Sequence, residues 1–247
     1  MVSQEAIETV LIGKTELKVD KLISINSFDS TFYILDNVLF KKSKNSKIDM
    51  GYSNFQLGNI TSVDAFNPLK INVFYKDFNT LIILDNRLSE IFKIDFNTTT
   101  PYKNVSHVAT GYDNTIWAFN QDTQQLELFD YKTKTTKAKT LPVKSEVLGI
   151  KSNYNYCWLL TKKYLYVFNY FGTLTEKIKN NGYDALAETN EKLILKKDNT
   201  LFFLDSATKP TIPIQLPNLT PDTFFATNET LYIYSHKIVY QYHLKTN

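Results

Sequence analysis

Short runs of strand-forming residues, separated by polar segments, recur along the whole chain. Residues 81–84 (LIIL), 165–168 (LYVF) and 201–204 (LFFL) are examples. Apolar residues on nearly every position indicate strands that are covered on both faces, because a strand with one solvated face alternates apolar and polar residues. No window of a dozen residues keeps the i, i+3, i+4, i+7 spacing of an amphipathic helix. The pattern therefore predicts an all-β protein.

The strand runs repeat at a regular interval. The second strand of each repeat is expected to begin at Phe32, Ile71, Ile116, Cys157, Leu193 and Leu231. The third strand is expected to begin at Val38, Leu81, Leu126, Leu165, Leu201 and Ile238. Both keep a period of about 40 residues, the length of one four-stranded propeller blade. We therefore predict a six-bladed β-propeller with four-stranded antiparallel blades in a single domain over residues 1–247. The blades are expected at about residues 20–50, 60–97, 105–142, 146–180, 183–217 and 222–244.

The last repeat offers only three strand runs, at 223–226, 231–234 and 238–244. Residues 6–12 (AIETVLI) read as a strand that belongs to no repeat. We expect this N-terminal strand to take the outer position of the last blade, because that pairing covers an edge that would otherwise invite aggregation.

Composition narrows the function classes. The chain has 16 Tyr and 17 Phe but only 7 Gly, and its net charge is +3 with the lysines dispersed among acidic residues. A nucleic-acid partner is therefore not expected, because such a partner requires a clustered basic surface. Cys157 is the single cysteine, so an intrachain disulfide is excluded, and its strand context indicates a small buried residue.

Two segments carry a resemblance to known propellers. Residues 126–141 (LELFDYKTKTTKAKTL) and 165–179 (LYVFNYFGTLTEKIK) resemble the outer strand pairs of bacterial quinoprotein-like propellers, including outer-membrane-assembly propeller lipoproteins, and of NHL-type six-bladed propellers. The turn glycine of these families survives only at Gly172, and the Trp that often closes the fourth strand is absent. The resemblance implies a scaffold or binding propeller of the bacterial cell envelope, and it carries over no site residue.

The sequence also bears on location. No apolar run approaches the roughly 20 residues of a membrane span, so no span is expected. The first five residues, MVSQE, have neither a basic nor an apolar signal region. We expect a periplasmic or envelope-associated chain whose export signal has been removed, with a cytoplasmic protein as the alternative.

Motifs for catalysis are missing from the sequence. Arg87 is the only arginine, which argues against a sialidase-like arginine triad, and Trp117 and Trp158 are too few for a quinone-dependent dehydrogenase with a tryptophan in each blade. Phosphate loops, HExxH and CxxC are absent, and no cofactor is expected. The histidines, His107, His236 and His243, lack a paired Asp or Ser at a recognisable spacing.

A metal-dependent enzyme stays open as an alternative. Asp64, Asn153 and Asn190 lie near the ends of the expected inner strands, and their oxygen atoms could hold calcium in the channel of a lactonase or other hydrolase. The same residue types are also the standard residues of tight turns. A carbohydrate-binding propeller that uses rim aromatics is a second alternative.

Aromatic and lysine residues alternate in the loops of one expected rim. In a propeller, the loops from second to third strands and the connections between blades share one rim. The candidate contact residues there are Tyr52, Phe55, Tyr75, Lys76, Phe78, Tyr102, Lys103, Lys162, Lys163, Tyr183, Lys196 and Lys197. Aromatic side chains provide large contact area at interfaces, and residues 51–59 (GYSNFQLGN) form the best candidate contact loop. The sequence thus predicts a non-catalytic scaffold that binds a protein partner, such as an envelope or outer-membrane assembly component.

Overall fold

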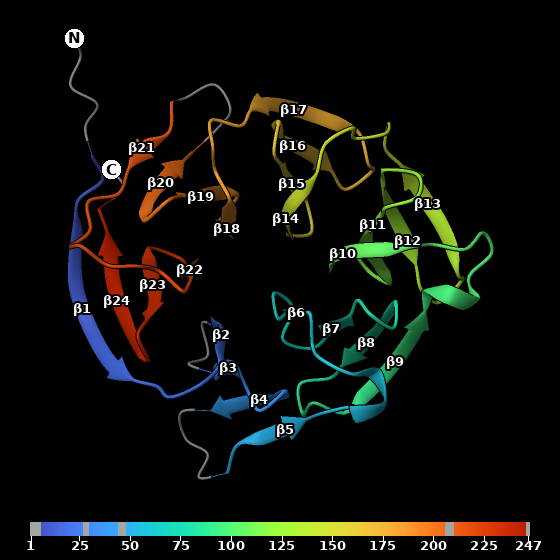
Figure 1. Ribbon diagram of the computed structural model, residues 1–247, viewed down its shortest axis with the longest axis horizontal. Coiled ribbons are helices and arrows are strands. Elements are labelled where there is room, and N and C mark those ends of the chain that lie inside the picture. The colour runs from blue at the N-terminus through green and yellow to red at the C-terminus, as the bar shows by residue number, and fades with distance from the viewer. Residues whose placement is uncertain (1–5, 27–29, 44–47, 206–209, 246–247) are drawn as a thin grey trace.

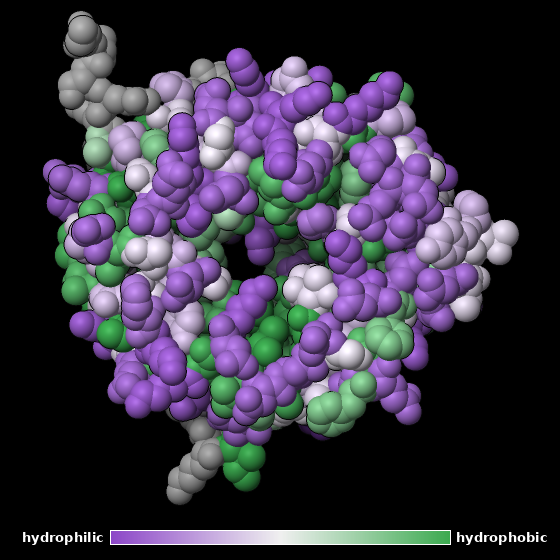
Figure 2. Space-filling model, viewed as in Figure 1, coloured by the Kyte–Doolittle hydropathy of each residue, from purple (hydrophilic) through white to green (hydrophobic). Residues whose placement is uncertain are grey.

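Six four-stranded antiparallel sheets surround a central channel in the computed structural model, which describes residues 6–26, 30–43, 48–205 and 210–245 (Figure 1). The predicted six-bladed β-propeller is confirmed. The first strand of each blade lies nearest the channel and the fourth lies outermost. The space-filling view looks through the opening at the centre of the ring (Figure 2).

Blades 1 to 3 contain these strands, in chain order. Blade 1 has β2 (Lys21–Ile25), β3 (Ser30–Leu35), β4 (Val38–Ser43) and β5 (Met50–Tyr52). Blade 2 has β6 (Ser62–Asp64), β7 (Ile71–Tyr75), β8 (Thr80–Leu84) and β9 (Glu90–Asp95). Blade 3 has β10 (Val105–Thr110), β11 (Thr115–Asn120), β12 (Gln125–Asp130) and β13 (Thr135–Lys139). The short 3₁₀ helices η1 (Phe55–Leu57) and η2 (Phe96–Thr98) lie in the connections before and after blade 2.

Blades 4 to 6 complete the ring. Blade 4 has β14 (Val147–Ser152), β15 (Tyr156–Thr161), β16 (Tyr164–Asn169) and β17 (Leu174–Lys179). Blade 5 has β18 (Ala185–Thr189), β19 (Lys192–Lys197), β20 (Thr200–Leu204) and β21 (Ile212–Pro213). Blade 6 has β22 (Thr223–Thr227), β23 (Thr230–Ser235), β24 (Ile238–Leu244) and, outermost, β1 (Thr9–Glu16).

The apolar core is divided into layers between neighbouring blades, which explains the continuous apolar runs. All five residues of β8 and all six of β11 are buried, whereas outer strands such as β13 alternate exposed and half-buried residues. Separate hydrophobic clusters lie between blades 1 and 2, 2 and 3, 3 and 4, and 4 and 5, and a larger cluster spans blades 5, 6 and 1. The inner strands of each blade are thus packed on both faces.

Tight turns hold the register of the second and third strands. Two-residue connections at Asp36-Asn37 and His236-Lys237 have positive φ at both positions, with values of 50° and 60° and of 50° and 63°. This backbone geometry matches the right-handed twist of the strands that it joins, and Asn and Asp tolerate it best among residues with a side chain.

The ring closes as predicted, through the N-terminal strand. β1 pairs antiparallel with β24, from Thr9 opposite Leu244 to Glu16 opposite Ile238, with a bulge between Leu11 and Gly13. The strand lies three to four residues further along the chain than the predicted 6–12, because Ile7 makes a different contact. The amide of Ile7 donates to the carbonyl of Pro213 at 2.9 Å, and its carbonyl accepts from the amide of Gln215 at 2.8 Å. The N-terminal segment therefore binds the outer edges of blades 5 and 6.

The fourth strands of blades 1 and 5 are shorter than their sequence suggests. The pattern of strand-forming residues predicts these two strands at 47–50 and 211–216, whereas the structure places β5 at Met50–Tyr52 and β21 at only Ile212–Pro213. Lys47 lies outside the described residues. Pro213 lacks the N–H needed to extend the ladder, which accounts for the short β21.

Tyr234 of β23 fastens the connection between β1 and β2. Its buried hydroxyl lies 2.9 Å from the carbonyl oxygen of Leu17 and 2.8 Å from that of Val19. We expect Tyr234→Phe to lower the free energy of unfolding by about 1–2 kcal/mol, because two carbonyls lose their partner. Tyr240→Phe in the adjacent strand, where the hydroxyl makes no hydrogen bond to a described residue, is the matched control. Urea unfolding measures both, and equal effects of the two variants would contradict the assigned role of Tyr234.

Candidate binding surfaces and channel

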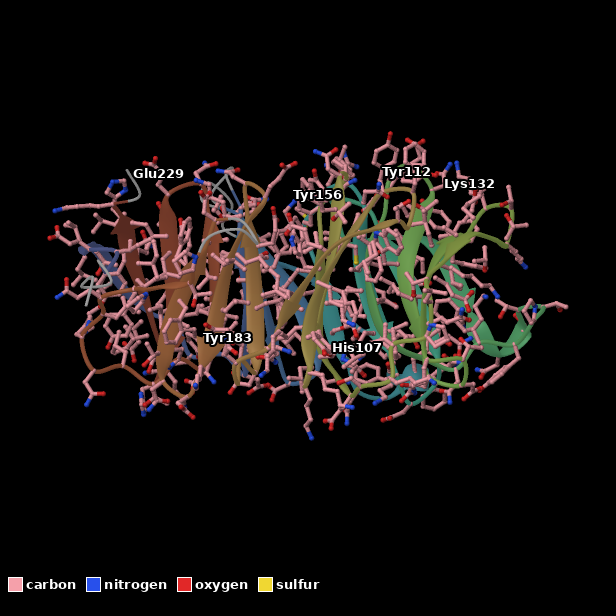
Figure 3. The ribbon with its side chains drawn as sticks, turned by 90° about the horizontal axis from the view of Figure 1, so that it is seen from above. His107, Tyr112, Lys132, Tyr156, Tyr183 and Glu229 are labelled. Carbon is pink, nitrogen blue, oxygen red and sulfur yellow. The ribbon has the colours of Figure 1, made fainter. Side chains whose placement is uncertain are left out.

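The propeller presents two rims. The first rim contains the loops from second to third strands and the connections between blades, and the second rim contains the loops from first to second and from third to fourth strands. In the edge-on view, His107 and Tyr183 lie toward the first rim, and Tyr112, Lys132 and Glu229 lie toward the second (Figure 3). The twelve contact residues expected from the sequence belong to the first rim.

The structure divides those twelve residues by burial. Seven side chains are exposed: Phe55, Lys76, Phe78, Tyr102, Lys162, Lys163 and Lys197. Lys196 is half-buried, and its ammonium lies 3.1 Å from both carboxylate oxygens of Asp184. Four residues are buried, namely Tyr52, Tyr75, Lys103 and Tyr183, so they do not contribute to the surface of the first rim.

The three buried tyrosines lie in the apolar layers between blades. Tyr52 and Tyr75 end their strands inside the cluster between blades 1 and 2, where the Tyr52 hydroxyl donates to Glu90 Oε1 at 2.7 Å. Burial and the Glu90 carboxylate raise the pKa of Tyr52. The hydroxyl of Tyr183 lies 2.8 Å from Thr211 Oγ1. The Tyr52 bond therefore joins blade 1 to blade 2, whereas the Tyr183 bond lies within blade 5 and the Tyr75 hydroxyl has no hydrogen-bond partner among the described residues.

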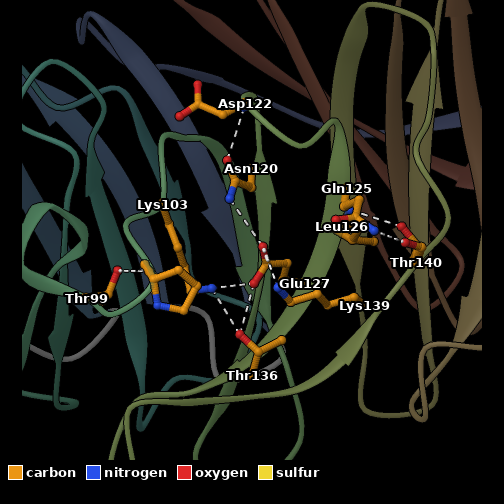
Figure 4. Close-up of polar contacts among 11 residues, drawn as sticks. Thr99, Lys103, Asn120, Asp122, Gln125, Leu126, Glu127, Thr136, Lys139 and Thr140 are labelled. Carbon is orange, nitrogen blue, oxygen red and sulfur yellow. Dashed lines mark hydrogen bonds and ion pairs between the residues drawn. The ribbon is translucent and has the colours of Figure 1, made fainter.

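Lys103 forms an ion pair inside blade 3. Its ammonium contacts the Glu127 carboxylate and lies 3.0 Å from Thr136 Oγ1 (Figure 4). The Lys103 side chain is 2% exposed and that of Glu127 is 1% exposed, so both charges are removed from water. Burial alone would raise the pKa of Glu127, but hydrogen bonds from Lys103 and Thr136 and the charge of Lys103 together hold it below its usual value. The pair joins the connection after blade 2 to the third strand of blade 3.

The exposed aromatics of the first rim lie in blades 2 and 3. Phe55 is 79% exposed, Phe78 48% and Tyr102 53%. The loops that carry them are adjacent, since a side chain at Gly58 would meet the ring of Phe78, and Asn79 donates to the carbonyl of Lys103 at 2.6 Å. The predicted contact loop thus forms part of this row.

A larger group of exposed apolar side chains lies on the second rim, above blades 2 to 4. We call it the aromatic patch, and it consists of Phe66, Leu69, Tyr154, Tyr170 and Phe171, which are 40% to 63% exposed. The rings of Phe66 and Tyr154 are 5.1 Å apart, and those of Tyr170 and Phe171 are 4.0 Å apart. Lys70 joins two of the loops by donating to the carbonyl of Asp113 at 2.6 Å.

The aromatic patch was not predicted from the sequence. Its residues occupy turns rich in Asn and Gly, as in Asn153-Tyr154-Asn155 and Asn169-Tyr170-Phe171-Gly172. The available signal was the presence of large apolar residues at turn positions, where polar residues are the rule. That signal does not reveal which turns meet in space.

The three residues proposed as calcium ligands lie at or beside the second-rim mouth of the channel. Asp64 and Asn190 line one cavity there. Asp64 Oδ2 accepts from the amide and hydroxyl of Thr110 at 2.8 and 2.7 Å. Asn153 Oδ1 accepts two turn amides, and its Nδ2 donates to Glu188 Oε1 at 3.2 Å. These contacts are those of strand ends and turns, and the described residues contain no group of three His, Cys, Asp or Glu side chains placed to hold a metal ion.

The histidines and the cysteine lie apart from one another. His107 is on the inner strand β10, and burial together with the charge of Lys76 lowers its pKa to about 4, so it is neutral at pH 7. His236 occupies the turn between β23 and β24, and His243 lies on β24. Cys157 is fully buried, and burial raises the pKa of its thiol well above the usual value, which makes it unreactive.

Comparisons with known proteins support the fold. Neither a family model nor a curated protein sequence matches the chain. Among solved structures, virginiamycin B lyase from Staphylococcus aureus, in a catalytically inactive variant with quinupristin, has a TM-score of 0.65 at 14% identity, covering 99% of this chain and 97% of that one. BamB from Moraxella catarrhalis has a TM-score of 0.53 at 14% identity over 87% of this chain and 70% of that chain. The Pan2 WD40 domain from Neurospora crassa has a TM-score of 0.62 at 8% identity, with 93% and 76% covered.

These similarities agree with the predicted β-propeller fold. One neighbour is named as an enzyme and others are not, so the shared fold alone assigns no activity. Among the residues that the structure describes, no helix has the length and hydropathy needed to cross a membrane.

Proposed function

We propose that this chain is a non-catalytic propeller that binds a protein partner through the aromatic patch of the second rim. The observation that carries the proposal is the gathering of five large, exposed apolar side chains from blades 2 and 4 on one face of a rigid ring. Exposed apolar groups of this kind mark interaction sites, and aromatic residues dominate the energetic centres of interfaces.

The rigidity of the scaffold also supports this proposal. Gly172 has φ of 83°, and a side chain there would meet Ala138 at 2.8 Å, so the loop that carries Tyr170 and Phe171 packs closely on blade 3. Tyr112 of blade 3 contacts Tyr170 edge to face, with ring centroids 5.9 Å apart. Loops held in this way lose little conformational entropy on binding.

The partner is proposed to be a component of a bacterial cell envelope. The architectural similarity to BamB supports this location. The exposed residues of the first rim, such as Phe55 and Phe78, provide a second surface that a larger assembly would use.

Partner binding is tested by comparing the two rims. The native partner is identified by crosslinking in the source organism and purified, and its affinity for the propeller is measured by calorimetry. We expect Tyr154→Ser with Phe171→Ser to weaken binding by about 2–4 kcal/mol, because hot-spot aromatics are lost. The matched control is Phe55→Ser with Phe78→Ser, which removes comparable exposed aromatics from the first rim.

Three outcomes would contradict the proposal. Unchanged affinity of the second-rim variant, or a larger loss of affinity in the first-rim control, would show that the partner does not bind through the aromatic patch. Turnover of a substrate by the purified chain would contradict a purely binding role. Circular dichroism of each variant checks that the propeller remains folded.

A further inference from the structure

The mouth of the channel at the second rim contains a cavity of about 290 Å³. Residues from blades 1, 2, 4, 5 and 6 line it, so it exists only in the closed ring. Much of its wall is apolar and includes Ile23, Ile25, Val63, Phe66, Ala187 and Phe225. Small-molecule sites combine such apolar walls with a few polar groups that fix the orientation of the ligand.

Two lysines supply unused hydrogen-bond donors. Lys151 lines the cavity from β14 of blade 4, and Lys21 lies on β2 of blade 1, the innermost strand on the opposite side of the channel (Figure 1). Neither ammonium group makes a hydrogen bond or ion pair with a described residue. Both lysines are exposed to solvent. Burial and then the charge of Lys151 lower the pKa of Lys21, and the charge of Lys151 also acts on the carboxylate of Glu188.

The acidic groups of the mouth are already engaged. Asp64 accepts three hydrogen bonds, two from Thr110 and one from the amide of Phe66 at 3.1 Å. Glu188 Oε1 accepts from Asn153 Nδ2 at 3.2 Å and from the amide of Glu191 at 2.9 Å. These bonds occupy Asp64 and one oxygen of Glu188, and both carboxylates keep their charge. The ammonium of Lys151 and the buried hydroxyl of Ser24, which also lines the cavity, have no hydrogen-bond partner among the described residues, so the mouth can donate to the acceptor atoms of a ligand.

We propose that this cavity binds a small organic anion in which a carboxylate is attached to an apolar group. The carboxylate accepts from Lys151, with Lys21 contributing its charge from across the channel, and the apolar group packs against Phe66 and the aliphatic wall. The cavity shares Phe66 with the aromatic patch, whereas Tyr170 and Phe171 lie outside its lining and stay available to a protein partner.

Benzoate is a suitable probe, because it joins one carboxylate to one apolar ring, and benzamide is its uncharged counterpart. We expect benzoate at constant ionic strength to raise the melting temperature in a saturable way and to give a measurable dissociation constant by calorimetry. Benzamide is expected to bind at least about tenfold more weakly than benzoate, since it lacks the negative charge. Inorganic phosphate serves as a third arm, and a stronger response to it than to benzoate would overturn the assignment to carboxylates.

Lys151→Met keeps the length and apolar stem of the side chain and removes the charge. We expect it to weaken benzoate binding about tenfold or more, and Lys21→Met to weaken it by a smaller factor, because Lys21 lies outside the cavity lining. Lys144→Met, at an exposed lysine of the first rim, is the matched control and should bind as the unaltered chain does. Equal binding of benzoate and benzamide, absence of binding at millimolar benzoate, or unchanged affinity in Lys151→Met would each overturn the proposal.

Discussion

Removal of residues 1–16 is expected to cause the largest loss of stability. The deletion takes away β1, exposes the full edge of β24 and removes the contacts of Ile7 with blade 5. Seven register pairs join β1 to β24, and their backbone hydrogen bonds together with buried Ile7 correspond to about 5 kcal/mol or more. A domain of ordinary stability has only about 5–15 kcal/mol in total. We therefore expect the shortened chain to unfold at much lower urea concentration and to aggregate through the open edge.

Two controls make this experiment specific. Removal of residues 1–5 alone leaves β1 and Ile7 in place and should change the unfolding midpoint little. A synthetic peptide of residues 6–16, added to the shortened chain, should restore the melting temperature in a concentration-dependent way. Full stability of the chain without residues 1–16 would show that β1 does not close the ring.

Glu127→Gln should have the next largest effect. The substitution keeps the size of the side chain and leaves Lys103 buried without a counter-charge. Breaking a buried pair in this way costs about 3–5 kcal/mol, whereas replacing both partners by apolar residues is often neutral. Urea unfolding should therefore show a severe loss for Glu127→Gln and a much smaller one for Lys103→Met combined with Glu127→Leu. Comparable losses in the two variants would contradict the assignment of the effect to the unpaired charge.

The same carboxylate makes stability depend on pH. The pKa of Glu127 is lower in the folded protein than in the unfolded chain, so its contribution is fully present above the unfolded value of about 4.3. The contribution is lost as the pH falls through the lower, folded value. We expect the free energy of unfolding to decrease with acid over this range and to decrease less steeply in Glu127→Gln.

Much of the architecture followed from the periodicity of apolar runs. Val38 and Ile238 begin their strands at the predicted residues, because the inner strands are buried on both faces and every position carries the signal. Outer strands were harder to delimit, since one face is solvated and local features decide their length, as Pro213 does for β21.

The candidate surfaces were less predictable, because burial depends on which residues meet across blades. Lys103 was predicted to be a contact residue of the rim, but it is buried in an ion pair with Glu127, which lies 24 residues away on a different strand. Phe66 and Tyr154 are in contact although they belong to blades 2 and 4, and no local pattern reports that proximity. Turn chemistry gives the position of a loop in sequence, but the closed ring determines its neighbours.

The pairing of β1 with β24 has a consequence for biosynthesis. The two strands are joined by more than 220 residues of chain, so the first strand leaves the ribosome long before its partner exists. Blades 1 to 5 are built from consecutive segments and can assemble during translation, at about 5–20 residues per second. The nascent chain must therefore keep β1 unpaired for many seconds, until the last blade has been made and the ring can close.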